Sequence, residues 1–303
     1  MLARARHFFA VQGVLEVDTP MVVNAPVTDV HIHSARVDLA QAALQPYFLH
    51  TSPEYAMKRL LAAGSGDIYQ ICHVVRGFER GRLHNSEFTL IEWYRIGYSL
   101  DRLMSEVDAL TRDLLADEGK SRVTERITYR DAFLRALGVD PLTASDAELA
   151  QLAQSHGLDA AEKSPRDEVL EFLMGTRVGP QLGRRVLTFV HGYPASQAAL
   201  ARLDPQDPRT ALRFELYADG IELANGFHEL ASATEQRSRF EQDRAERLRR
   251  GLPTYDLDER LLAALEAGLP ECAGVALGFD RLIMLAAGVE TIDEVLAFPT
   301  ERA

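Results

Sequence analysis

The order of hydrophobic and polar residues predicts helices and strands along most of the chain. Residues 3–12 have the helical period, and Phe8, Phe9 and Val11 fall on the side expected to face a core. The dipeptide at 219–220, Asp-Gly, predicts a tight two-residue turn between two strands. The other predicted elements are strands 68–76, 87–95, 186–191, 212–217, 221–227 and 273–277 and helices 51–63, 232–250, 258–267 and 279–287.

The segment from about residue 100 to residue 178 has helical periods interrupted by glycine and proline, with little strand content. We predict one large catalytic domain that spans residues 1–303 and contains a small helical insertion at residues 121–182. Strands joined by hairpins, followed by a late strand-to-helix unit, predict an α+β fold. We therefore expect a mainly antiparallel β-sheet flanked by helices.

Composition narrows the class of protein. A chain of 303 residues with 47% hydrophobic content can bury a large core. The formal net charge of -12 argues against broad binding to nucleic acid, which needs a surplus of Lys and Arg. The two cysteines, Cys72 and Cys272, are isolated and fit neither a disulfide framework nor a metal site. With no long apolar run and no secretion signal, we expect a cytoplasmic protein.

The predicted hairpin at 68–95 carries the first candidate chemistry. Four cationic or potentially cationic side chains lie at its loop: Arg76, Arg80, Arg82 and His84. Guanidinium groups suit phosphate oxygens, so this loop is expected to close over a polyanion such as a triphosphate. Alternation along the return strand places four side chains on one face: Phe88, Leu90, Glu92 and Tyr94. The alternative is an ordinary exposed hairpin with a charged tip.

The second set of candidate site residues lies in the stretch RFELYADGIELANGFHEL. With a two-residue turn, Glu222 pairs with Tyr217, so Glu215 and Glu222 share a face of the hairpin. Two such carboxylates are oxygen ligands suited to Mg²⁺. A bulge near Asn225 is needed to bring Asn225 and Glu229 into the same pocket. The alternative is a half-exposed hairpin whose acids face water.

Two shorter motifs complete the candidates. In GVALGFDRLIML, Gly278 stands where a strand passes into a helix, and Arg281 falls in the first helical turn, which favours anions. Such an arrangement suits a terminal phosphate. In the segment TSPE, Thr51 and Glu54 have the spacing of a capping box. A helix cap therefore explains this segment as well as a binding role does.

Taken in order, these segments resemble the three signature motifs of class II aminoacyl-tRNA synthetases, and specifically the lysyl branch. Residues 8–20 resemble motif 1, residues 68–95 motif 2 and residues 274–285 motif 3. The stretch ELANGFHEL is similar to the lysyl-branch segment that binds metal and amino acid. The resemblance covers nearly the whole chain, and four ordered motifs are far more specific than any one.

The resemblance extends to the short paralogues of lysyl-tRNA synthetase that ligate (R)-β-lysine to elongation factor P, through TSPEYxMKRL, EWYR, GIELANGFHEL and GVALG. Motif 1 begins almost at Met1, so we expect no anticodon-binding domain. The resemblance implies an ATP- and Mg²⁺-dependent, adenylate-forming ligase that is a homodimer. Its implied partners are (R)-β-lysine or lysine and elongation factor P, with tRNA disfavoured. The alternatives are a truncated enzyme that charges tRNA and a non-catalytic regulator.

The resemblance also implies roles for individual residues. Arg76 and Arg281 are the implied catalytic residues, on the α-phosphate and the terminal phosphate. The implied ATP site comprises Arg76, Gly77, Phe78, His84, Asn85, Phe88, Glu222, Leu223, Gly278 and Arg281. The implied amino-acid site comprises Ser52, Glu54, Tyr94, Asn225, Glu229 and Ala276, and the implied Mg²⁺ ligands are Glu215 and Glu222. One departure is Phe78, which stands where the family has an acidic residue.

Overall fold

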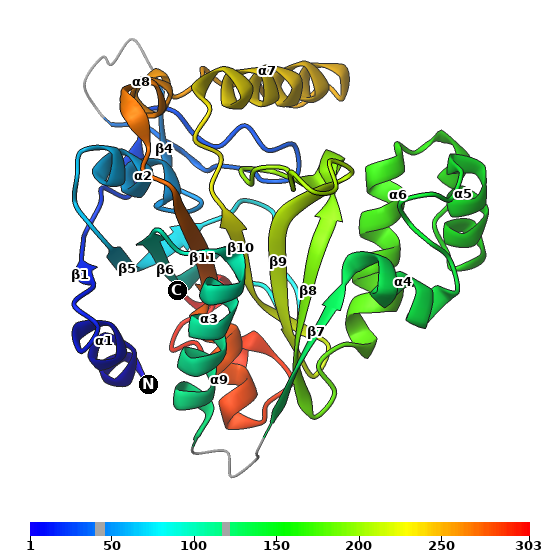
Figure 1. Ribbon diagram of the computed structural model, residues 1–303, viewed down its shortest axis with the longest axis horizontal. Helices are drawn as coiled ribbons and strands as arrows, with labels where there is room; N and C mark the ends of the chain where they lie inside the picture. The colour runs from blue at the N-terminus through cyan, green and yellow to red at the C-terminus, as the bar shows by residue number, and fades with distance from the viewer. Residues whose placement is uncertain (40–45, 117–121) are drawn as a thin grey trace. The chain divides into compact units, whose positions relative to one another are not determined.

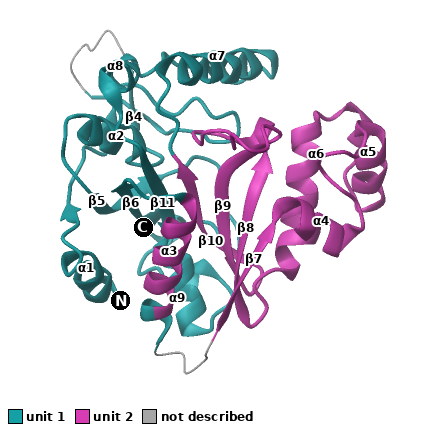
Figure 2. Ribbon diagram, viewed as in Figure 1, with its two compact units in different colours: residues 1–99, 113–118, 229–303 teal, residues 100–112, 119–228 magenta. Residues whose placement is uncertain are grey.

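The computed structural model describes residues 1–39, 46–116 and 122–303, and its elements are labelled in Figure 1. The chain divides into two compact units (Figure 2). Unit 1 contains residues 1–99, 113–118 and 229–303, and unit 2 contains residues 100–112 and 119–228. Each unit combines helices with a largely antiparallel set of strands, which confirms the α+β prediction. In the described part of the chain, no helix is long and apolar enough to cross a membrane.

The strands of unit 1 follow the predicted hairpin. β5 (Ile68–Val75) pairs antiparallel with β6 (Glu87–Ile96), and β6 pairs antiparallel with β11 (Cys272–Gly278). The short β1 (Leu15–Glu16) runs parallel to β5. A second, three-stranded sheet has the order β2 (Val22–Val23), β4 (Tyr47–Leu49) and β3 (Arg36–Val37). The segments that resemble motifs 2 and 3 therefore lie on neighbouring strands.

The long helices of unit 1 are α1 (Leu2–Ala10), α2 (Glu54–Ala62), α7 (Ala233–Arg249), α8 (Glu259–Gly268) and α9 (Phe279–Ala287). Phe9 of α1 is fully buried and stacks on Tyr69, with 4.3 Å between ring centroids. Val11 is 67% exposed because it follows the last helical residue, so its predicted inward position was wrong. Cys272 is buried and Cys72 half-buried, and both are free thiols, as their packing role predicts.

Unit 2 has four strands in the order β10 (Ile221–His228), β9 (Thr210–Ala218), β8 (Val186–Pro194) and β7 (Val123–Thr128). β8, β9 and β10 are antiparallel, and β7 runs parallel to β8. Asp219 and Gly220 both have positive φ, 48° and 77°, which confirms the tight turn. The predicted pairing of Glu222 with Tyr217 is also confirmed.

The helices of unit 2 include α3 (Leu100–Leu115), which ends among unit 1 residues, α4 (Tyr129–Leu137), α5 (Asp146–Ser155) and α6 (Arg166–Leu173). Tyr129, Phe133 and Leu170 are buried together in one core. The predicted helical insertion begins too early, because residues 123–128 form β7. Their β-branched side chains favour an extended backbone, and β8 supplies the hydrogen-bonding partner. Residues 117–121 lie outside the described residues.

Candidate active site

A buried carboxylate, Glu92, lies at the centre of the acidic part of unit 1. Ser52 Oγ donates a hydrogen bond to Glu92 Oε2 at 2.7 Å, and Tyr94 Oη donates to Oε1 at 2.7 Å. Glu92 and Tyr94 share a face of β6, as the alternation of the strand predicts. Only 2% of each residue is exposed. Two hydroxyl donors thus fix both oxygens of this carboxylate.

Two further carboxylates meet at a lysine. Lys58 Nζ lies 2.6 Å from Glu54 Oε1 and 2.6 Å from Glu229 Oε2. Glu54 and Lys58 are four residues apart on α2, which places them on the same side of the helix. Burial by itself lowers the pKa of Lys58, but Glu229 and Glu54 together raise it above its ordinary value. The lysine is therefore an ammonium ion inside the protein.

The start of α2 differs from the predicted capping box. The helix begins at Glu54, Pro53 stands at the cap position, and no side chain caps it. Ser52 Oγ instead accepts a hydrogen bond from the backbone N–H of Glu54 at 3.0 Å. Thr51 uses its carbonyl oxygen to accept a hydrogen bond from Arg76 Nε at 3.2 Å. The capping interpretation was wrong, and the Glu54 carboxylate is directed to Lys58.

Burial has the largest effect on the pKa values of Glu92, Glu229 and Tyr94 in this cluster. It raises the pKa of Glu92 to about 8, with further contributions from Glu54 and Glu229. Burial also raises the pKa of Glu229 to about 7, against the opposing effect of Lys58. Burial and the nearby Glu92 raise the pKa of Tyr94, so its hydroxyl remains a donor. A cationic ligand would reverse these shifts, because an opposite charge favours the ionised carboxylate.

Strand β11 faces the cluster with small residues. Gly274 lies opposite Tyr94 and Ala276 lies opposite Glu92 in the β6–β11 register. A Cβ atom on Gly274 would lie 2.3 Å from the Tyr94 ring and 2.6 Å from Glu229 Oε1, a clash with both. Directly opposite residues share a face, so the Ala276 methyl group belongs to the face of Glu92. The glycine keeps room for the ring and the carboxylate.

Arg76 lies between this cluster and an aromatic side chain. Its guanidinium carbon is 5.1 Å from the centroid of the Phe88 ring, a cation–π distance. The hydrogen bond from Nε to Thr51 orients the fork of donors. Phe88 is half-buried and leaves part of its ring accessible. The Arg76 guanidinium group is suited to bind a phosphate, and the Phe88 ring is suited to stack on an adjacent aromatic base.

Arg281 is joined to the hairpin loop through a histidine. Arg281 lies in the first turn of α9, as predicted, and its Nη2 lies 2.6 Å from His84 Nε2. Its Nε donates to the carbonyl oxygen of Leu83 at 3.2 Å. Partial burial, then Arg281 and Arg76, lowers the pKa of His84 to about 4. His84 is therefore a neutral acceptor near pH 7, and both arginines lie near enough to act on it.

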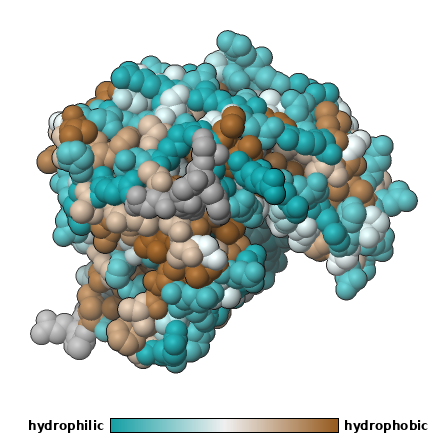
Figure 3. Space-filling view, turned by 90° about the horizontal axis from the view of Figure 1, so that it is seen from below, coloured by the Kyte–Doolittle hydropathy of each residue, from teal (hydrophilic) through white to brown (hydrophobic). Residues whose placement is uncertain are grey.

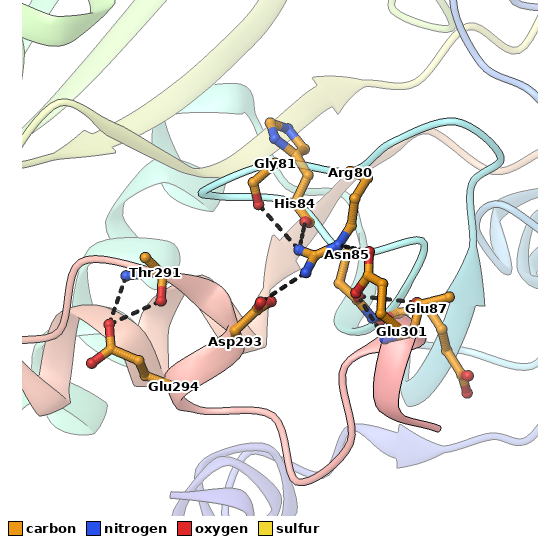
Figure 4. Close-up of polar contacts among 10 residues, drawn as sticks. Arg80, Gly81, His84, Asn85, Glu87, Thr291, Asp293, Glu294 and Glu301 are labelled. Carbon is orange, nitrogen blue, oxygen red and sulfur yellow. Dashed lines mark hydrogen bonds and ion pairs between the residues drawn. The ribbon is translucent and has the colours of Figure 1, made fainter.

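The rest of the loop is fixed by the C-terminal segment (Figure 4). Asn85 Oδ1 accepts hydrogen bonds from the N–H and hydroxyl of Thr300, at 3.1 and 3.0 Å. Arg80 donates to Asp293 at 2.7 Å and to Glu301 at 2.5 Å. The cationic loop is thus attached to the C-terminal segment, and Arg80 is already paired with carboxylates of the same chain.

The turn after Arg76 brings the backbone close to residue 33. Gly77 N–H donates to the carbonyl oxygen of His33 at 2.7 Å, and a Cβ on Gly77 would lie 3.3 Å from that oxygen. Phe78 has a φ of 63° and is 91% exposed, with its ring edge-on to His33. An exposed aromatic residue with positive φ is unusual, since the left-handed region favours glycine. The Phe78 ring is accessible to a ligand.

Unit 2 contains the predicted metal carboxylates. Register and the period of two place Glu215, Tyr217 and Glu222 on one face of the β9–β10 hairpin, as predicted. The bulge lies between Glu222 and Ala224, not near Asn225 as predicted, and Leu223 is the extra residue. This shift places Asn225 directly opposite Glu215. The bulge thus brings Asn225 to the face of Glu215 from a different position, and the predicted meeting of Asn225 with Glu229 stays a prediction.

An arginine organises this face. Arg213 Nη2 donates to Glu215 Oε1 at 2.5 Å, and its Nε donates to Asn225 Oδ1 at 3.2 Å. Tyr217 Oη donates to Glu215 Oε2 at 2.6 Å. Within the described ranges, no group of three or more His, Cys, Asp or Glu forms a metal site. A carboxylate oxygen has a second lone pair and is the kind of ligand that Mg²⁺ takes, so Glu215 and Glu222 have the donor type for Mg²⁺, and their metal role stays a prediction.

Comparison with known proteins agrees with this architecture. Residues 1–302 match the model of the family "tRNA synthetases class II (D, K and N)". The chain belongs to this family. It is 52% identical over 304 residues to a protein of Vibrio vulnificus (strain YJ016) named "Elongation factor P--(R)-beta-lysine ligase", covering 99% of this chain and 93% of that one. A protein of the same name from Vibrio cholerae is 52% identical over 308 residues, covering 100% and 94% of the two chains.

As a class II family member, the chain has site residues that sequence reasoning did not assign. Glu92 was placed on the correct face but left out of the implied amino-acid site. Lys58 was not considered, although its spacing of four from Glu54 on a predicted helix was a signal. Arg213 and Gly274 gave no signal by themselves, because their importance depends on strand register. The other predicted site residues keep their roles as proposals.

Proposed function

We propose that the protein is an ATP-dependent ligase that activates (R)-β-lysine, or lysine, and joins it to a lysine side chain of elongation factor P. The observation that carries this proposal is the buried cluster of Glu54, Glu92 and Glu229. Such a cluster suits a substrate with two ammonium groups, because a buried charge needs a partner of opposite sign. The names of the relatives support the same reaction.

In this proposal the ammonium groups of the substrate bind to the acidic cluster. Hydrogen bonds from Ser52 and Tyr94 orient the Glu92 carboxylate, which ionises fully when the cationic substrate binds. Asn225 is proposed as an amide contact of the substrate. The methyl group of Ala276 occupies space beside Glu92. One added methyl group in a tight pocket is enough to change which lysine isomer fits.

ATP is proposed to bind through cations and backbone groups. Arg76 would contact the α-phosphate and Arg281 the terminal phosphate, and the half-buried Phe88 would stack on the base. The remaining proposed contacts come from Gly77, Phe78, His84, Asn85, Glu222, Leu223 and Gly278. Asn85 Nδ2 donates a hydrogen bond to the carbonyl oxygen of Glu87, and Asn85 Oδ1 accepts one from Thr300, so Asn85 would act by fixing the loop. Mg²⁺ held by Glu215 and Glu222 would offset charge on the triphosphate.

The proposed reaction has two steps. The substrate carboxylate attacks the α-phosphorus of ATP, forms an acyl-adenylate and releases pyrophosphate. The ε-amine of the acceptor lysine then attacks the acyl carbon and releases AMP. Arg76 would stabilise the charge that develops on the α-phosphoryl oxygens, and His84 would keep Arg281 oriented toward the leaving group. Catalysis in this scheme rests on positioning and electrostatics, without a covalent enzyme intermediate.

We also propose that the protein is a homodimer and that the reaction takes place in the cytoplasm. α1, the residue that follows it and β1 expose large apolar side chains: Leu2, Val11 and Leu15 are 41%, 67% and 55% exposed. Groups of hydrophobic residues are visible among hydrophilic ones on the face drawn in Figure 3. Apolar side chains exposed beside a short edge strand favour association with a second copy. Sedimentation at two protein concentrations tests this proposal.

The first step is tested by ATP–pyrophosphate exchange with the purified protein. Exchange that depends on (R)-β-lysine or lysine supports the proposal, and exchange with neither amino acid contradicts it. A charging assay with tRNA tests the competing function of a tRNA-charging enzyme. Transfer to tRNA but not to elongation factor P would replace the proposed acceptor.

A further inference from the structure

The ammonium group of Lys58 is buried inside unit 1. The side chain is 2% exposed, and its two carboxylate partners, Glu229 and Glu54, are 1% and 16% exposed. Both contacts measure 2.6 Å. One partner lies on the same helix and the other follows β10 in sequence. Lys58 therefore links two segments that are far apart along the chain.

Packing alone does not explain a lysine at this position. Its neighbours on the buried side of α2, Met57 and Leu61, are apolar and almost completely buried. A hydrophobic residue of similar length would fill the same space without the cost of burying an ammonium group. The positive charge of Lys58 is therefore explained by its effect on the Glu54 and Glu229 carboxylates.

The charge balance of the cluster points to the same role. Three carboxylates, Glu54, Glu92 and Glu229, influence one another, and Lys58 is the cation that opposes their repulsion. The other titratable groups that interact with these carboxylates include Tyr55, Tyr94, Cys72 and Cys272. Burial raises the pKa of all four, so they are neutral near pH 7. Once ionised, three carboxylates and one ammonium leave two negative charges. That number matches the two ammonium groups of β-lysine.

We propose that Lys58 is a positioning residue of the amino-acid site, whose ammonium group holds Glu54 and Glu229 in place and sets the pocket to accept a diammonium substrate. This inference rests on the proposed function. Lys58 contacts no reacting atom, and it acts through the two carboxylates. Without it, Glu229 would bind a proton more tightly, and the pocket would bind its substrate well only at higher pH.

The test compares Lys58→Met with Lys58→Arg, which keeps the charge, and with Arg59→Met. Arg59 is the exposed neighbour on the same helix and controls for loss of one positive charge. In β-lysine-dependent pyrophosphate exchange, Lys58→Met should raise KM for β-lysine at least about tenfold, which is about 1.4 kcal/mol. It should leave KM for ATP within about twofold of wild type and move the pH dependence of KM for β-lysine upward. Lys58→Arg should raise KM for β-lysine less and keep the wild-type pH dependence, and Arg59→Met should match wild type.

Two results would overturn the inference. One is a wild-type KM and pH dependence for Lys58→Met. The other is an equal loss of ATP and β-lysine binding in Lys58→Met and Lys58→Arg, which indicates a packing role. If Lys58→Met does not fold, Lys58→Gln, which also lacks the charge, replaces it, and a wild-type KM for β-lysine with the wild-type pH dependence in Lys58→Gln overturns the inference. Failure of the wild-type protein to use β-lysine would instead contradict the proposed function.

Discussion

Arg281 Nη2 and His84 Nε2 lie 2.6 Å apart, with the histidine as a neutral acceptor. The contact ties the first turn of α9 to the loop between β5 and β6. It sets the direction of the guanidinium group without neutralising its charge. A carboxylate at residue 84 would orient the arginine equally well but would compete with phosphate for it.

We therefore expect His84→Leu to raise KM for ATP about tenfold or more, because a hydrogen bond to a charged group contributes about 1.5–3 kcal/mol. His84→Gln keeps an acceptor and should stay close to wild type. Since the pKa of His84 is about 4, KM for ATP in the wild type should not change through protonation of His84 above about pH 5. Pyrophosphate exchange at varied ATP measures both effects. Equal KM values for His84→Leu and wild type would contradict the role.

The raised carboxyl pKa values predict how stability varies with pH. Glu92 and Glu229 bind protons more tightly in the folded protein, with pKa values of about 8 and 7, than in the unfolded chain, where 4.5 is the ordinary value. Their contribution to stability is therefore full below about pH 4.5 and is lost as pH rises toward 8. The ligand-free protein should lose Tm between about pH 4.5 and about pH 8, and Glu92→Gln should lose less.

Thermal melts with and without β-lysine check this prediction. Bound β-lysine should remove most of the loss, because its ammonium groups favour the ionised carboxylates. A Glu92→Gln variant with the same pH slope as wild type would show that Glu92 ionises normally in the folded state.

Gly274 should not tolerate a side chain. In Gly274→Ala the new methyl group would lie 2.3 Å from the Tyr94 ring and 2.6 Å from Glu229. We expect a stability loss of about 1–3 kcal/mol and a KM for β-lysine raised at least about tenfold, with KM for ATP little changed. Gly175→Ala is the matched control, because a Cβ there meets nothing within 4 Å. A Gly274→Ala enzyme with normal KM for β-lysine would place the substrate elsewhere.

The proposed metal ligands predict a specific defect in Mg²⁺ dependence. Glu222→Gln should raise the Mg²⁺ concentration for half-maximal exchange about tenfold, since an amide oxygen carries no charge. The exposed Glu162→Gln in the same unit controls for loss of one negative charge and should not differ from wild type. An unchanged Mg²⁺ requirement in Glu222→Gln would remove this residue from the proposed metal site.

Local patterns in the sequence predicted most of the elements that form the site. The β5–β6 hairpin, the Asp219–Gly220 turn and the placement of Arg281 depend on neighbouring residues, and all three are confirmed. The capping box at Thr51 was wrong, because α2 begins at Glu54 without a side-chain cap, and Ser52 contacts Glu92. No local pattern could decide this.

Other features depend on contacts that the sequence does not encode locally. The position of the bulge at Leu223 is set by the pairing of a whole hairpin. β7 was missed because a six-residue strand is stabilised by its partner β8 more than by its own propensity. The role of Gly274 depends on Tyr94 and Glu229, two residues from different parts of the chain. Such relationships require three-dimensional structure.

The most direct test of the proposed function is the intact mass of elongation factor P after incubation with the purified protein, ATP, Mg²⁺ and (R)-β-lysine. The account predicts a mass gain of one lysyl group on a lysine side chain, which disappears without ATP and with the Arg76→Ala variant. No mass gain under conditions where the same enzyme preparation catalyses β-lysine-dependent pyrophosphate exchange would contradict the proposed acceptor.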